Sequence, residues 1–203
     1  MATSNVSIAN LALQKLGEPT IVSLTEDSRN ARSMNACFEA MRDRELRAYA
    51  WHFTKKRATL APSSVAPEFQ YTYAFPLPSN YLRLIKFARA GSDWHLEQHE
   101  GALAILTNDG NALEIRYQAK VTDPTLFDPI FVDMLACKLA WHCCEQITQS
   151  NAKKDALMQE YTYHRAEARR TNAFEVTPPP QPVDDWITAR RTGSLVGVDW
   201  DEE

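Results

Sequence analysis

The cysteines and one histidine near residue 140 are the residues whose types could bind a metal ion. The run His142-Cys143-Cys144 follows Cys137, and thiolates and imidazoles are ligands that zinc prefers. On a helix, Cys137 and Cys144 would share a face while His142 would point elsewhere, and adjacent residues cannot both reach one tetrahedral ion without breaking the helix. We therefore interpret the four cysteines as reduced, buried thiols and predict no metal site.

Paired carboxylates could hydrolyse a polysaccharide, because glycosidases place two carboxyl groups at a set separation across a cleft. The available pairs are Glu97 with Glu100, Asp123 with Asp128, and Glu26 with Asp27. Spacing along the chain does not give their separation in space, and acidic surfaces commonly contain such pairs. Hydrolysis of peptidoglycan or capsule polysaccharide is therefore kept as an alternative, for which we name no catalytic residue.

Other catalytic signatures are missing from the sequence. It has no Walker-type loop and no GxGxxG, GxSxG or HExxH motif, and its six glycines leave little room for a phosphate-cradling loop. His52, His95, His99 and His164 are scattered, and we interpret them as structural or surface residues, with a cluster of His95 and His99 left open. We predict no cofactor and no enzymatic activity.

The segment 28–53 carries the strongest structural signal and predicts one long amphipathic helix, from about Arg29 to His52. Its apolar residues recur at helical spacing: Ala31, Met34, Phe38, Met41, Leu46 and Tyr49. The opposite face carries five arginines, a residue type suited to pairing with carboxylates across a contact: Arg29, Arg32, Arg42, Arg44 and Arg47. We predict that these arginines lie at subunit interfaces. Nucleic-acid binding is the alternative, which the interleaved acidic residues disfavour.

Three further helices and a β region are predicted. The helices are expected at about 5–16, at about 128–147 after an Asp128-Pro129 start, and from 151 onward. The strands are expected at 58–60, 71–75, 82–89, 94–98, 104–106 and 112–119. Asn108-Asp109-Gly110-Asn111 is predicted as a hairpin turn, because Asp-Gly tolerates positive φ.

The C-terminal segment 174–203 differs in composition from the rest. Residues 177–182 read Thr-Pro-Pro-Pro-Gln-Pro, which predicts a stiff polyproline II stretch. Seven acidic residues and two arginines give 174–203 a net charge of −5, so residues 1–173 carry +1 of the total of −4. Its candidate docking residues are Trp186, Ile187, Arg190, Arg191, Leu195 and Trp200. We predict an arm that docks on another subunit; a disordered terminus is the alternative.

These elements predict an α+β fold with three parts. Residues 1–56 and 122–173 are expected to form a bundle of about four helices. Residues 57–121 are expected to form a small antiparallel β region inserted into that bundle, and 174–203 an extended, proline-rich acidic arm. The net charge of −4 argues against a dedicated DNA-binding protein. We also expect no secretory signal, no membrane span and folding in a cytoplasm.

Several short motifs, by their order and spacing, resemble the tail tubular protein A family of short-tailed bacteriophages. They are 8–28 (IANLALQKLGEPTIVSLTEDS), the long helix, 56–60 (KRATL), 73–78 (YAFPLP) and 80–84 (NYLRL). The resemblance covers residues 5 to about 170. It implies a structural virion protein, a head-to-tail adaptor whose ring of about twelve copies joins the portal ring to the tail nozzle protein.

The resemblance implies further properties. The ring would be assembled in the host cytoplasm, would reside in the virion tail, and would line the DNA exit channel used during ejection. Genomic DNA would pass without sequence-specific binding, which suits a wall that is neutral or acidic. The terminal arm would dock on the portal or on a neighbouring copy. A virion-associated polysaccharide hydrolase that also acts as an adaptor is the alternative.

Overall fold

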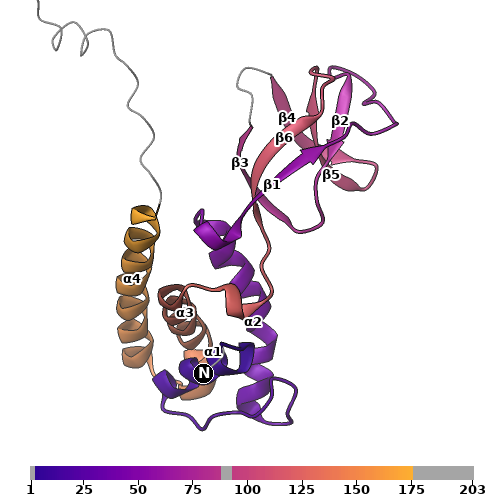
Figure 1. Cartoon of the computed structure of the whole chain (residues 1–203). Helices are drawn as coiled ribbons and strands as arrows, with labels where there is room; N and C mark the ends of the chain where they lie inside the picture. Colours follow the sequence, from indigo (N-terminus) through magenta and orange to yellow (C-terminus); the bar gives the residue numbers. More distant parts are fainter. Residues whose placement is uncertain (1–2, 88–92, 176–203) are drawn as a thin grey trace, which may run out of the picture.

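The computed structural model of this chain describes residues 3–87 and 93–175. These residues form four α-helices, α1 (Asn5–Leu16), α2 (Arg29–Ala48), α3 (Pro129–Thr148) and α4 (Asn151–Phe174), with six strands between α2 and α3 in the chain. The helices form one body, and the strands project from one end of it as a β region (Figure 1). The predicted α+β fold of about four helices with an inserted antiparallel β region is confirmed. Residues 176–203 of the predicted arm lie outside the described residues.

Side-chain caps start the helices where the sequence places them. The side chains of Ser4, Ser28, Asp128 and Ser150 each accept a hydrogen bond from a backbone N–H in the first turn of their helix. Helix α1 ends at Gly17, whose φ of 74° lies in the left-handed region that glycine adopts without steric cost. The bounds of α1 therefore follow directly from local sequence.

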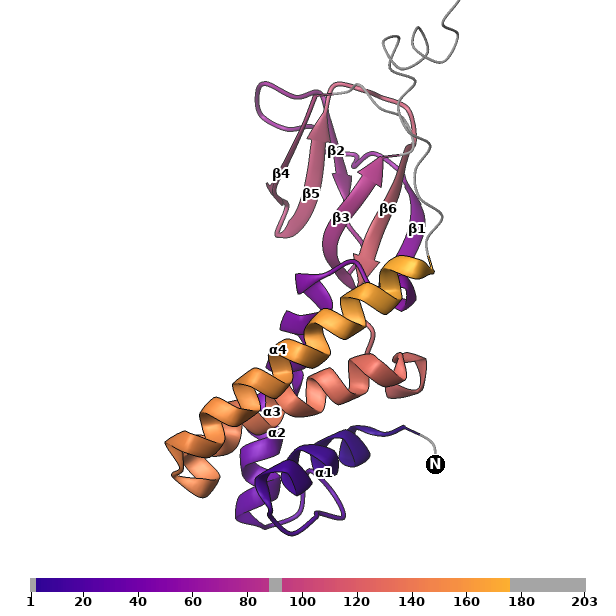
Figure 2. The ribbon, with the colours of Figure 1, turned by 90° about the vertical axis from the view of Figure 1, so that its left-hand side faces the viewer.

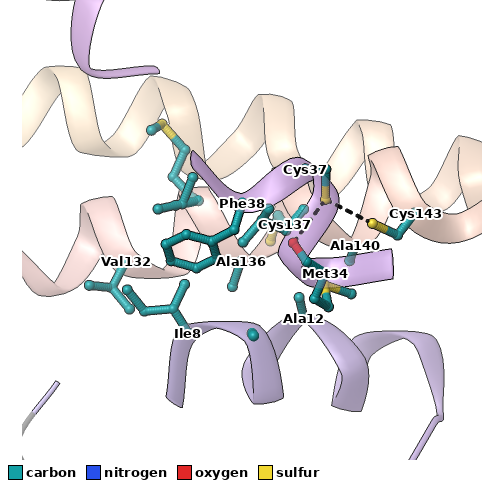
Figure 3. Packing of buried hydrophobic residues seen from close by; sticks show 14 of the residues in the cluster. Ile8, Ala12, Met34, Cys37, Phe38, Val132, Ala136, Cys137, Ala140 and Cys143 are labelled. Atoms are coloured by element: carbon teal, nitrogen blue, oxygen red, sulfur yellow. Dashed lines mark hydrogen bonds between the residues drawn. The ribbon is translucent and has the colours of Figure 1, made fainter. Parts of the chain in front are cut away.

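Helix α3 is the centre of the helical body. It packs against α1, α2 and α4, and it has buried side chains around its whole circumference. Ala136 and Ala140 are fully buried and let neighbouring helices approach closely. Figure 3 shows Ile8 of α1 and Phe38 of α2 among the side chains packed around this part of α3. A single continuous core thus joins α1 and α2 to helices that follow them by about a hundred residues in the chain.

Helix α2 ends at Ala48, four residues earlier than predicted. Tyr49 is extended, and a short 3₁₀ helix, η1, follows at His52–Thr54. Groups distant in sequence satisfy the last turn of α2: the Gln118 amide donates to the carbonyls of Leu46 and Tyr49. The Trp51 indole likewise donates to the carbonyl of Glu45, at 2.9 Å. The prediction of one helix to His52 was wrong because these tertiary hydrogen bonds stop it.

The β region consists of two three-stranded antiparallel sheets. Its strands are β1 (Lys55–Leu60), β2 (Tyr73–Pro76), β3 (Tyr81–Phe87), β4 (Trp94–His99), β5 (Ala102–Thr107) and β6 (Leu113–Ala119). Sheet A has the order β1-β6-β3, and sheet B has the order β2-β5-β4 (Figure 2). Phe75 and Ile105 of sheet B form one buried cluster with Ile115 and Tyr117 of sheet A. The two sheets therefore share a small core of their own.

The hairpin turn lies elsewhere than predicted. Asn108-Asp109-Gly110-Asn111 connects β5 to β6, which belong to different sheets and do not pair. The tight hairpin joins β4 to β5 through Glu100 and Gly101, with φ values of 49° and 80°. Two consecutive positive φ values are what a two-residue hairpin loop of the I′ type requires. The Asp-Gly segment thus joins strands of two different sheets instead of closing a hairpin.

Candidate interaction surfaces

Two of the five arginines predicted at subunit contacts instead hold the protein together. Arg29 donates to the carbonyl of Gln146 in the last turn of α3, where a cation offsets the negative end of the helix dipole. Arg47 donates to the carbonyl of Leu82 in β3 at 2.6 Å, so it links the end of α2 to sheet A. Both guanidinium groups are therefore engaged within the chain.

Arg42 does not lie on the exposed face. It is 1% exposed, and its Nε donates to Asp43 Oδ1 at 2.9 Å while its buried Nη2 has no hydrogen-bond partner among the described residues. Its assignment to the exposed face was wrong for a geometric reason. Phe38, Arg42 and Leu46 are spaced by four, so Arg42 continues the buried apolar stripe of α2. The four-residue spacing alone indicates that Arg42 is buried.

Arg32 and Arg44 are the two members of the predicted set that remain exposed and do not bind a backbone carbonyl. Arg32 pairs with Asp27 at 2.5 Å, in a contact whose two side chains are 69% and 92% exposed. Such pairs contribute little to folding. Four of the five predicted arginines are thus exposed, and two of these four also bond within the chain. That these arginines lie at subunit contacts stays a prediction.

A buried polar cluster that we did not predict from the sequence lies where α2, α3 and α4 meet. The Tyr161 hydroxyl donates to Glu45 Oε1 at 2.9 Å, and burial raises the pKa of Tyr161 to about 12. The Lys138 ammonium lies 4.7 Å from the centre of the Tyr161 ring and 4.3 Å from that of Trp141. Burial lowers the pKa of Lys138, and the Glu45 carboxylate opposes that effect. The only signal in the sequence was a lysine within an apolar helix.

The cysteines are buried within the helical body. Cys37 and Cys143 bring their sulfur atoms to 3.1 Å across the α2–α3 contact, and this sulfur–sulfur hydrogen bond raises the pKa of Cys143 (Figure 3). Cys144 bonds Thr148 on the same helix at 3.2 Å, while His142 is exposed. The structure therefore does not bring the run His142-Cys143-Cys144 together around one point.

Two triplets in the described residues place potential metal ligands within 4.8 Å of one another. The first comprises Cys137, Glu160 and His164, and the Lys15 ammonium donates to Glu160 there, which keeps the pKa of that carboxyl low. The second comprises His52, Asp128 and Glu175. In it Asp128 caps α3, and His52 Nδ1 lies 2.7 Å from Glu175 Oε2. In both triplets, side chains already bond to other groups of the protein.

The carboxylates considered for hydrolysis have structural partners. Glu26 accepts the N–H groups of Val22 and Ser23, and Asp123 accepts the hydroxyl and the N–H of Thr125. These hydrogen bonds lower the pKa of both carboxyls. A general acid needs a raised pKa instead, so that it holds a proton near neutral pH. Glu100 has a positive φ in the β4–β5 turn, and its carboxylate accepts from Ser63 at 3.2 Å. These groups are placed for turn and cap formation.

The histidines of β4 do not form a cluster. His95 lies 3.7 Å from Glu97, whereas His99 contacts the carbonyl of Val65 at 3.1 Å. They are four residues apart on one extended strand, which separates them by roughly 13 Å. The possibility of a joint site at His95 and His99 is therefore not supported.

Three partly exposed apolar side chains lie on β4 and β5. Trp94, Leu96 and Leu103 are 40%, 39% and 51% exposed, and we call these three residues the β4 strip. Leu96 pairs with the fully buried Ile105, and Trp94 packs edge-on against Phe87 of sheet A at 5.1 Å between ring centres. The strip therefore extends the apolar interface between the two sheets to its rim, where no described residue covers it. Two of its three residues lie on β4, an edge strand whose outer backbone groups are unpaired within sheet B.

The predicted docking residues of the arm, Trp186, Ile187, Arg190, Arg191, Leu195 and Trp200, lie outside the described residues. No helix in the described ranges combines the length and the apolar content that crossing a membrane requires. A scan of protein-family models and a search of curated proteins each return no match to this chain.

Proposed function

We propose that this chain is a structural virion protein, a head-to-tail adaptor that forms a ring between a portal ring and a tail nozzle protein. The proposal rests on the resemblance of its motif order to the tail tubular protein A family. One structural observation supports it: the β4 strip is an apolar surface of the projecting β region that no described residue covers. Apolar side chains that continue a core into solvent are typical of surfaces that another protein covers.

The described groups fit a contact role better than a catalytic one. The polar side chains of the helical body bond each other or cap helices, and the β region projects from that body with its open edge exposed. In the proposed ring, the β4 strip packs on a neighbouring copy, and DNA passes through the centre without sequence-specific binding. The ring resides in the virion tail after assembly in the host cytoplasm.

Native mass spectrometry of the chain mixed with portal rings of the same phage tests this function. We expect each portal ring to gain a fixed multiple of 23.0 kDa, which gives the number of copies in the adaptor ring. The variant W94S/L96S/L103S should add fewer copies, because it removes the apolar contact between neighbours. A soluble, folded wild-type chain that adds no mass to the portal would contradict the proposal.

A matched control variant is available on α4. Met158 is 39% exposed, as Leu96 is, but lies on the helical body away from the strip. The variant M158S should add the same number of copies as the wild type. Loss of assembly in M158S, together with normal assembly of the triple variant, would place the subunit contact on α4 instead of β4.

A further inference from the structure

The outward face of sheet A is strongly basic. Cross-strand register places Arg57, Arg116 and Lys86 side by side on β1, β6 and β3. The next row, on the side of the helical body, contains Lys55 and Arg83 on either side of the buried Gln118. Side chains two residues apart on a strand share a face, so Glu114, a carboxylate, lies on this face too. We call Lys55, Arg57, Arg83, Lys86 and Arg116 the basic face.

The central row of the basic face has an unbalanced charge. Like charges directly opposite each other on neighbouring strands are destabilising. Arg57, Lys86 and Arg116 are exposed, and the described ranges 3–87 and 93–175 supply no ion pair to any of them. They line a surface hollow of about 540 Å³ together with Thr59, Phe87 and Glu114. Three aligned cations around a hollow are a surface suited to an anionic partner.

The chain itself contains a matching anion. Residues 176–203 carry six acidic residues and two arginines, a net charge of −4, so residues 1–175 are neutral in sum. The acidic residues form two groups, Asp184-Asp185 and Asp199 with 201–203. A segment whose charge is opposite to that of the basic face thus follows directly after α4.

The structure also places the start of that segment beside sheet A. Glu175 is held by His52, whose Nδ1 lies 2.7 Å from the carboxylate, and Asn172 accepts the His52 backbone N–H at 2.8 Å. Lys55, the first residue of β1, is three residues from His52. Figure 2 shows this end of α4 at the base of the β region. The segment therefore leaves the helical body at the foot of the basic face.

The proline-rich spacer has the reach that this docking needs. Eight residues, 176–183, extend roughly 25 Å in a polyproline II conformation. The six residues of β1 extend about 20 Å. Asp184 and Asp185 can therefore reach any row of the basic face. We propose that the basic face of sheet A binds the acidic C-terminal segment 183–203 of the same chain, an inference that does not depend on the adaptor function.

Tryptic cleavage at Arg190-Arg191 in the full chain tests this docking. The variant R57Q/R116Q removes two charges from the basic face, and its matched control R32Q/R44Q removes two exposed charges from α2. Cleavage after 190 and 191, followed by mass spectrometry, should be roughly fivefold faster in R57Q/R116Q than in the wild type and unchanged in R32Q/R44Q, because cleavage follows the undocked population. The wild type should also be cleaved faster at ~0.5 M salt, where screening shortens the range of charge attraction to ~4 Å.

Carbodiimide cross-linking gives an independent measurement. Lys55 or Lys86 should become linked to Asp184, Asp185 or Asp199 within one chain, and the links should disappear in D184N/D185N/D199N. Equal cleavage rates in the wild type and R57Q/R116Q, with no such link, would overturn the proposal. Links only between differently isotope-labelled chains would overturn the assignment to the same chain. Loss of affinity for a DNA duplex in R57Q/R116Q without a change in cleavage would assign the face to nucleic acid instead.

Discussion

The helical body and the β region differ in whether their charged side chains bond within the chain. In the helical body, Lys15 donates to Glu160, Arg29 to a carbonyl of α3, and Lys153 to the carbonyl of Leu16. Even the buried Lys138 lies against two aromatic rings. In sheet A of the β region, by contrast, aligned cations point outward without a described partner. Charges that are bonded internally specify a fold, whereas charges left unpaired at a surface indicate a contact.

The same contrast holds for apolar groups. The helical body buries α3 on all sides, while the small core of the β region opens to solvent along β4. Two small sheets supply too little surface to close their own interface completely. Contacts with other molecules should therefore be sought first on the β region. The arginine-rich helix, which the sequence emphasised, serves mainly as part of the core.

The largest expected effect comes from the helical core. Phe131 is fully buried and packs edge-on against Trp51, Phe53 and Phe127. Phe131→Ala should lower the free energy of unfolding by about 3–5 kcal/mol through lost burial and the cavity left behind. Urea denaturation followed by circular dichroism measures the change. Phe131→Leu, which retains most of the volume, should cost less than about 1.5 kcal/mol; an equal cost for both would show that this site is not tightly packed.

A second variant tests the junction between the two parts. Gln118 is fully buried in β6, and its amide donates to the carbonyls of Leu46 and Tyr49 at the end of α2. Gln118→Ala leaves these acceptors without a partner and should destabilise the protein by about 1–3 kcal/mol. Hydrogen exchange of α2 and of sheet A should rise together. Faster exchange in only one of the two would mean that the parts unfold independently.

A third prediction concerns high pH and the helical body alone. Burial raises the pKa of Cys137 to about 11 from an ordinary value of 9.0, so the unfolded chain loses this proton first. The stability contributed by the neutral thiol is therefore complete below pH 9 and is lost as the pH rises towards 11. We expect a loss of up to about 2 kcal/mol across this window. Urea titrations of the wild type between pH 8 and 11 should show a steeper decline than those of Cys137→Ala, and parallel curves would contradict this.

The smallest effect on stability should come from the β4 strip. Leu103 is 51% exposed, and Leu103→Ser should change the free energy of unfolding by less than about 0.5 kcal/mol. The same variant should weaken association with other copies or with the portal. A stability loss as large as that of a core residue would mean that the strip belongs to the internal core of the β region, and the contrast between the two regions would then fail.

Much of the fold could be predicted because local rules decide it. The Asp128-Pro129 start of α3, the glycine end of α1 and the alternation within β6 all appear in the structure as expected. The end of α2 could not be predicted, since Gln118 and Trp51 cap it through contacts made only after folding. The hairpin between β4 and β5 was not predicted either. Asp-Gly indicated a reversal at 109–110, and the positive φ values that a tight hairpin requires fell instead on Glu100 and Gly101.

The interaction surfaces were harder to predict than the fold. Arg42 looked like a surface cation by residue type, but its place on the stripe with Phe38 and Leu46 made it internal. The β4 strip gave no signal, because Trp94, Leu96 and Leu103 read as ordinary strand residues until the pairing of sheets A and B showed which side is covered. The basic face likewise depends on register. Arg57, Lys86 and Arg116 are far apart in sequence and become a row only when β6 lies between β1 and β3.

The connection between α2 and sheet A has a mechanical consequence. Four bonds tie the last part of α2 to the β region: Gln118 donates to the carbonyls of Leu46 and Tyr49, Arg47 donates to the carbonyl of Leu82, and Lys120 pairs with Asp43 at 2.7 Å. Because these bonds lie at different points around the joint, the β region cannot swing on a single pivot. A force applied to the tip of the β region would therefore be transmitted as a torque to α2 and to the packed helical interior. The β region and the helical body would then respond to that force as one stiff unit.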